Sequence, residues 1–147
     1  MNTLTQTQRI LGALWGALVG DALGVPVEFL NRALLKSKPV TGMREFGTHQ
    51  QPAGTWSDDS SLLLCTVESL VACQHLDGKD LGDRFVRWER DGHWTPRGAV
   101  FDIGVATSQA LSRIAMGESP EEAGGADEYS NGNGSLMRII PDENRAS

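Results

Sequence analysis

Apolar residues recur at helical spacing along several separate segments of this 147-residue chain. In the first segment they lie one, three or four residues apart, as on one face of a helix: Ile10, Leu11, Leu14, Trp15, Leu18 and Val19. Similar patterns predict helices that follow residue 58 and that span roughly residues 80–91 and 103–116. No alternating apolar and polar pattern persists, so no strand is expected. The sequence therefore predicts an all-α fold.

Three glycines recur every fourth residue within the first predicted helix, at Gly12, Gly16 and Gly20. A glycine inside a helix costs about 1 kcal/mol relative to alanine. Three of them on one face therefore predict that another backbone packs very close to this helix. The helix is expected to end near residues 24–26.

Two other segments have composition that bears on the fold. Residues 31–56 contain five glycines and prolines and make a connection so long that we expect it to be functional or partly helical. Residues 119–122, Ser-Pro-Glu-Glu, are typical of a helix start, and the two glycines at 124 and 125 would end that helix early.

Composition excludes several functional classes. Hydrophobic residues make up 39% of the chain and charged residues 22%, as in an ordinary soluble domain. The net charge is −6 and the 13 basic residues are scattered, so nucleic acid is not an expected partner. No run of about 18 apolar residues occurs, so no membrane span is expected. Cys65 and Cys73 would lie about 12 Å apart on one helix, too far for a disulfide, which favours reduced thiols and a cytoplasmic location.

A hydroxyl and two carboxylates stand where the second apolar helix begins. Residues 54–61 are Gly-Thr-Trp-Ser-Asp-Asp-Ser-Ser, and three leucines follow. The adjacent carboxylates of Asp58 and Asp59 repel each other, and the free N–H groups of a helix N-terminus supply part of the compensating positive charge. A hard divalent cation such as Mg²⁺ or Ca²⁺ would supply the rest, because it prefers oxygen ligands. The alternative is an ordinary helix cap followed by acidic residues in the first turn.

Three further motifs accompany this acidic pair. Residues 16–29 are Gly-Ala-Leu-Val-Gly-Asp-Ala-Leu-Gly-Val-Pro-Val-Glu-Phe. Residues 97–98 and 101–107 are Arg-Gly and Phe-Asp-Ile-Gly-Val-Ala-Thr, and residues 131–138 are Asn-Gly-Asn-Gly-Ser-Leu-Met-Arg, ahead of Pro141. In this order, and with Trp-Ser-Asp-Asp-Ser at 56–60, the four motifs resemble those of the ADP-ribosylglycohydrolase family. That family includes the enzyme that reactivates dinitrogenase reductase.

The resemblance implies an all-helical fold, an orthogonal multi-helix bundle with a binuclear Mg²⁺ site. It also implies hydrolysis of the bond that joins ADP-ribose to a protein side chain or a small acceptor. By position, Ser57, Asp58 and Asp59 would be metal ligands, with serine where threonine is more usual. Glu28, Asp58 and Asp59 would be the catalytic carboxylates, Glu28 lying at the edge of the substrate cleft. Mg²⁺ could orient the ribose hydroxyls and activate a water, with a carboxylate as general base.

The resemblance also implies a substrate site for ADP-ribose. Asp102, Gly104 and Thr107 would lie near the ligand. Backbone N–H groups of four small or polar residues would contact the diphosphate or ribose: Gly132, Asn133, Gly134 and Ser135. Some alternatives are simpler: Glu28 as a solvated residue at a helix end, Asp102 as a helix cap, and the Gly-Asn segment as an ordinary loop. The three histidines have no ligand spacing, so no zinc site is expected.

The chain departs from the family in its later part. Family members are considerably longer, and their later half supplies an Asp-x-Asp motif followed by Ser or Thr, which is absent from this sequence. Residues 1–147 are therefore expected to form a single partial domain, the N-terminal half, with only part of the Mg²⁺ site. Exposed apolar faces would then favour a homo-oligomer or a complementary chain. Three hypotheses follow: an ADP-ribosyl hydrolase, a non-catalytic ADP-ribose or nucleotide-binding module, and a truncated remnant that acts as a structural partner.

Overall fold

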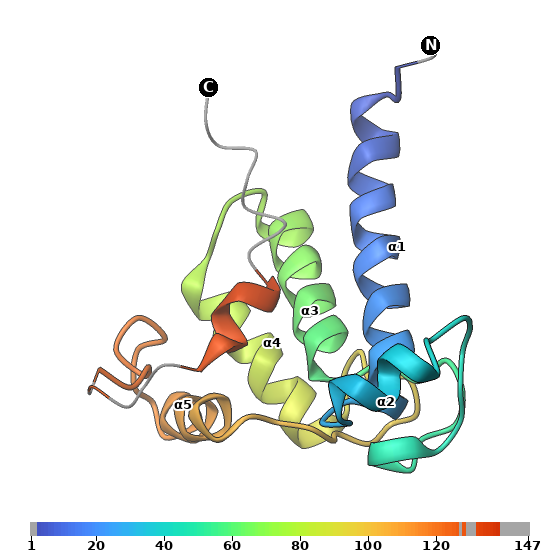
Figure 1. The fold of residues 1–147 in the computed structure, drawn as a ribbon. Helices are drawn as coiled ribbons and strands as arrows, with labels where there is room; N and C mark the ends of the chain where they lie inside the picture. Colours follow the sequence, from blue (N-terminus) through green and yellow to red (C-terminus); the bar gives the residue numbers. More distant parts are fainter. Residues whose placement is uncertain (1–2, 127, 129–131, 139–147) are drawn as a thin grey trace. The chain divides into compact units, whose positions relative to one another are not determined.

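The computed structural model describes residues 3–126, 128 and 132–138, and the regular elements among these residues are helices. Five α-helices and three 3-10 helices follow one another in the order shown in Figure 1: α1 (Gln6–Gly24), η1 (Val25–Val27), α2 (Arg32–Ser37), η2 (Gly47–His49), α3 (Asp58–Cys73), α4 (Gly78–Asp91), α5 (Val105–Ala115) and η3 (Asn133–Arg138). No described residue belongs to a strand, although Phe46 and Gln51 form an isolated antiparallel bridge. The all-α prediction is confirmed.

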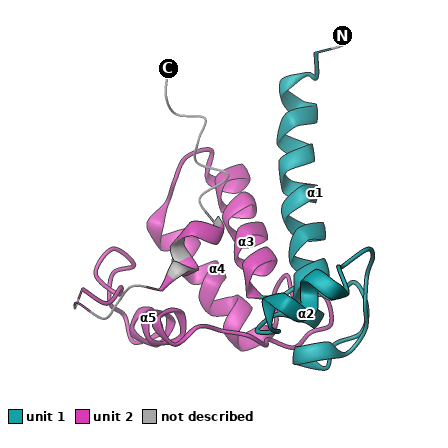
Figure 2. Cartoon of the chain, viewed as in Figure 1, with its two compact units in different colours: residues 1–57 teal, residues 58–147 magenta. Residues whose placement is uncertain are grey.

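The chain divides into two compact units, residues 1–57 and residues 58–147 (Figure 2). The first unit holds α1, η1, α2 and η2, and the second holds α3, α4, α5 and η3. The expectation of a single domain stays a prediction.

In the first unit, α1 begins with a capping box. The Thr5 hydroxyl accepts the N–H of Gln8, and the Gln8 side chain accepts the N–H of Thr5. The helix ends at Gly24 and continues as η1, whose residues Val25 and Pro26 are buried. The expected end near residues 24–26 is confirmed.

The glycine face of α1 does not contact another backbone among the described residues. Apart from the helix itself, no atom lies within 4 Å of a Cβ built on Gly12, Gly16 or Gly20. Within the first unit, the prediction of close packing is therefore wrong, and the surrounding part of α1 is exposed, Trp15 by 65%. By length and composition alone, residues 6–27 meet the requirements of a membrane span, as core helices of soluble proteins also do. The expected absence of a membrane span stays a prediction.

The second unit is built around one apolar core. Helix α4 packs against both α3 and α5, and η3 packs against α3. The buried core residues come from all three α-helices: Leu62, Cys65, Phe85, Trp88 and Leu111. Helix α4 is capped at its start by Asp77, whose carboxylate accepts the N–H of Asp80, and at its end by Gly92 in the left-handed conformation. Three of the predicted helices thus appear close to their expected bounds.

Two local predictions have different outcomes. Residues 119–122 form a turn and not a helix: the Ser119 carbonyl accepts the N–H groups of Glu122 and Ala123, and the glycines at 124 and 125 follow at once. The long connection is partly helical, as expected, because it contains α2 and η2.

Both cysteines are free, and burial raises the pKa of the Cys65 thiol to about 12.

Candidate functional site

The three proposed metal ligands are consecutive at the start of α3. Ser57 directly precedes the helix, and Asp58 and Asp59 are its first two residues. Ser57 and Asp58 are buried, with 5% and 7% of their surface exposed, while Asp59 is exposed. A buried carboxylate needs partners, so Asp58 is not an ordinary solvated first-turn residue. The hydroxyl and carboxylate oxygens have the hard-donor chemistry that Mg²⁺ prefers.

Asp21 of α1 binds Ser57 through three contacts within the first unit. The backbone N–H of Ser57 donates to Oδ1 at 3.1 Å and to Oδ2 at 3.0 Å, and the Ser57 hydroxyl donates to Oδ1 at 2.9 Å. Asp21 was not among the residues predicted for the site. The available signal was that Asp21 is the one charged residue between Ile10 and Val27, since a lone carboxylate in an apolar helix needs a partner.

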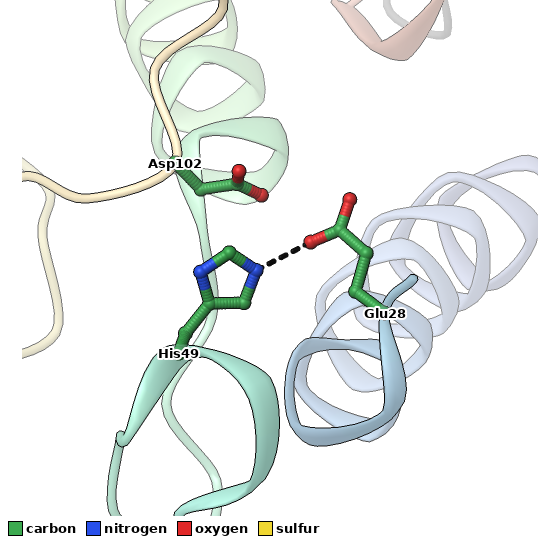
Figure 3. A group of neighbouring side chains, drawn as sticks. All are labelled: Glu28, His49 and Asp102. Atoms are coloured by element: carbon green, nitrogen blue, oxygen red, sulfur yellow. Dashed lines mark hydrogen bonds and ion pairs between the residues drawn. The ribbon is translucent and has the colours of Figure 1, made fainter. Parts of the chain in front are cut away.

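Glu28 lies just after η1 and is held by η2. His49 Nε2 lies 2.6 Å from the Glu28 carboxylate, and the Thr48 hydroxyl donates to the Glu28 carbonyl oxygen at 2.6 Å. Figure 3 shows the pair of Glu28 and His49; Asp102, also labelled there, belongs to the second unit. Glu28 thus has a side-chain partner in His49, and its proposed place at the edge of a substrate cleft stays a prediction. Sequence reasoning missed His49, because nothing local marks a contact across 21 residues.

The proposed substrate residues of the second unit form two groups. Asp102 has a positive φ of 59°, Gly104 is the N-cap of α5, and Thr107 is buried in its first turn. Because the cap is Gly104, with no side-chain cap bond, the alternative of Asp102 as the helix cap is wrong. The Gly104 carbonyl instead accepts the N–H of Ser108 at 2.9 Å.

The glycine-rich segment lies against the start of α5. A Cβ on Gly132 would meet the Cβ of Ala106 at 3.7 Å. Asn133, Gly134 and Ser135 form the first half of η3, so this segment is more regular than an ordinary loop. The structure therefore brings two of the motifs together within the second unit. Asn131 and Pro141, which belong to the same motif, lie outside the described residues.

The comparisons with known proteins agree with this arrangement. The family model for ADP-ribosylglycohydrolase matches residues 2–142. An ADP-ribosylarginine hydrolase Tri1 of Pseudomonas putida is 37% identical over 95% of this chain and 37% of its own length. The ADP-ribosyl-[dinitrogen reductase] glycohydrolase of Rhodospirillum rubrum is 30% identical over 90% of this chain and 43% of its own length.

A solved structure is also similar. A chain described as an ADP-ribosylglycohydrolase-related protein complex superposes with a TM-score of 0.72 at 42% identity, over 90% of this chain and 41% of that chain. The chain thus spans about two fifths of the length of the relatives it matches. Since the family model covers nearly all of its residues, the chain belongs to the ADP-ribosylglycohydrolase family.

Proposed function

We propose that this chain carries the Mg²⁺-binding and phosphate-binding part of an ADP-ribosyl hydrolase, which removes ADP-ribose from a modified protein or small acceptor. The observation that carries the proposal is the buried Ser57-Asp58 pair at the start of α3, within a chain matched by the family model from residue 2 to residue 142. The proposed reaction uses one or two Mg²⁺ ions, and the three residues at 57–59 would supply part of their oxygen shell.

The proposed roles follow from the chemistry of each group. Ser57, Asp58 and Asp59 would hold Mg²⁺ through hard oxygen atoms. When bound, Mg²⁺ supplies Lewis-acid stabilisation of negative charge on the substrate. Glu28 accepts a proton from the attacking water as general base, and His49 holds its carboxylate in place. Asp102, Gly104 and Thr107 line the ligand, and the N–H groups of residues 132–135 bind its diphosphate.

The names of the relatives support a protein substrate. The Pseudomonas putida relative is named for ADP-ribosylarginine and the Rhodospirillum rubrum relative for ADP-ribosylated dinitrogen reductase. We accordingly propose an ADP-ribosylated arginine side chain as the first substrate to test. The two free cysteines support a cytoplasmic location.

A second candidate function is an ADP-ribose-binding module without turnover. It is favoured by the glycine-rich segment at residues 132–135, which lies against the start of α5. Binding through backbone N–H groups at residues 132–135 would not require a metal ion.

The deciding experiment measures both release and binding of ADP-ribose. The purified chain is incubated with an ADP-ribosylated arginine peptide in Mg²⁺ and in chelator, and ADP-ribose binding is measured by calorimetry. We expect release that depends on Mg²⁺ and is abolished in the double variant Asp58→Asn/Asp59→Asn. The control is Asp83→Asn, which removes an exposed carboxylate of α4 and should leave release unchanged. Binding without release, equal in both buffers, would support the module, and absence of both would refute each proposal.

A further inference from the structure

The contact between Asp21 and Ser57 determines how the Ser57 hydroxyl can act. Ser57 is 5% exposed, and both its backbone N–H and its hydroxyl point to the same carboxylate. Two anchoring points, one on the backbone and one on the side chain, fix the side-chain torsion of this serine. A neutral partner would fix it less firmly, because hydrogen bonds to a charged acceptor are stronger.

The contact with Asp21 also fixes the direction in which the Ser57 hydroxyl proton points. A serine hydroxyl has one proton to donate and two lone pairs. Since the proton goes to Asp21 Oδ1 at 2.9 Å, the oxygen offers only lone pairs to any further neighbour. That is the state a cation ligand requires, and the nearby negative charge also raises the electron density on the oxygen. Residues that hydrogen-bond to metal ligands commonly have this orienting effect.

We propose that Asp21 is a positioning residue that holds the Ser57 oxygen ready to bind a divalent cation. The inference rests on the proposed metal role of residues 57–59 and adds to it a residue 36 positions upstream. Asp21 acts through Ser57 and is not itself a ligand. A merely structural tie between α1 and the segment before α3 would predict a loss of stability without a specific effect on cation binding.

The test measures binding of Mn²⁺ alone to the full chain by electron paramagnetic resonance, which detects the free ion. The variants are Asp21→Asn, Ser57→Ala and the double variant, with Asp83→Asn as control for loss of one carboxylate. We expect Asp21→Asn to weaken Mn²⁺ binding about 10- to 100-fold, as is typical when a residue that orients a metal ligand is removed. The double variant should bind no more weakly than Ser57→Ala, because the proposed effect of Asp21 on the cation passes through that hydroxyl. Additive effects would overturn the proposal.

A metal-free readout completes the design. In the wild-type chain the Ser57 amide proton is donated to a carboxylate, so its exchange with solvent is expected to be slow and its NMR shift downfield. Both features should be lost in Asp21→Asn and retained in Ser57→Thr, which keeps the hydroxyl and should also keep Mn²⁺ binding. If the wild-type chain binds no Mn²⁺, the metal site of the proposed function fails, and this inference with it. If the wild-type chain binds and Asp21→Asn binds equally well, this inference alone fails.

Discussion

Gly47 is the residue that allows η1 and η2 to approach each other. Its φ is +55°, and a Cβ at this position would collide with the backbone carbonyl of Pro26. The next two residues, Thr48 and His49, both bind Glu28. The position of the proposed general base therefore depends on a residue without a side chain.

We expect Gly47→Ala to lower the free energy of unfolding by about 2–4 kcal/mol, because it combines a left-handed backbone with overpacking against a rigid backbone atom. The measurement is urea denaturation of the full chain. Gly42→Ala is the matched control, since nothing lies within 4 Å of its added Cβ. The control should be neutral or stabilising by up to about 1 kcal/mol. Equal stability of the two variants would contradict the close approach.

At the scale of elements, Glu68 links α3 to α4 and to the segment after α4. Its carboxylate accepts hydrogen bonds from His93 Nε2 at 2.7 Å and Trp94 Nε1 at 2.9 Å, and it pairs with Arg84 at 2.7 Å. Burial by itself would raise the pKa of Glu68, but the three donors outweigh it and lower that pKa to about 2. The Arg84 guanidinium likewise lowers the pKa of Asp80 to about 2.

These shifts predict a loss of stability in acid. A carboxylate whose pKa is lower in the folded state stabilises that state above its ordinary pKa, and this contribution is lost as the pH falls toward the folded-state value. For Glu68 the window runs from pH 4.5 down to about 2. We expect the urea midpoint to fall across this window, and to fall less steeply in Glu68→Gln, which does not titrate. A pH dependence identical in both proteins would show that Glu68 carries none of the effect.

The same variant tests the network at neutral pH. We expect Glu68→Gln to cost about 1–2 kcal/mol of unfolding free energy, because charge-assisted hydrogen bonds are lost at a partly exposed site. Asp83→Asn is the control, since its pair with Lys79 is exposed and should leave the midpoint unchanged. An equal effect of the two substitutions would mean that the network around Glu68 contributes no more to the free energy of unfolding than a surface ion pair.

Helical periodicity was enough to predict the main elements, because α1, α3, α4 and α5 carry their apolar residues at regular spacing. The helix-start signal at residues 119–122 failed, because two glycines follow it and no second turn forms. Helical periodicity could not find η2, which is only three residues long. Helical periodicity also could not predict the pairs Asp21–Ser57 and Glu28–His49. These pairs join residues 36 and 21 positions apart and depend on tertiary packing.

For the whole molecule, α1 carries an exposed apolar face. Leu11, Trp15 and Val19 recur every fourth residue and are 50%, 65% and 44% exposed. A contiguous apolar face of this kind marks an interaction surface or a tendency to associate. In a solution of the isolated chain, a second copy of the chain can cover this face.

We therefore expect the isolated chain to self-associate as its concentration rises, and Trp15→Lys to suppress this association by placing a charge at the centre of the apolar face. Sedimentation velocity over a concentration series measures the effect. Met116→Lys is the matched control, because Met116 is a large apolar residue that is 77% exposed but lies at the end of α5. Circular dichroism should show equal helix content in all three proteins. A wild-type chain that stays monomeric throughout, or equal suppression by both substitutions, would show that the α1 face does not drive association.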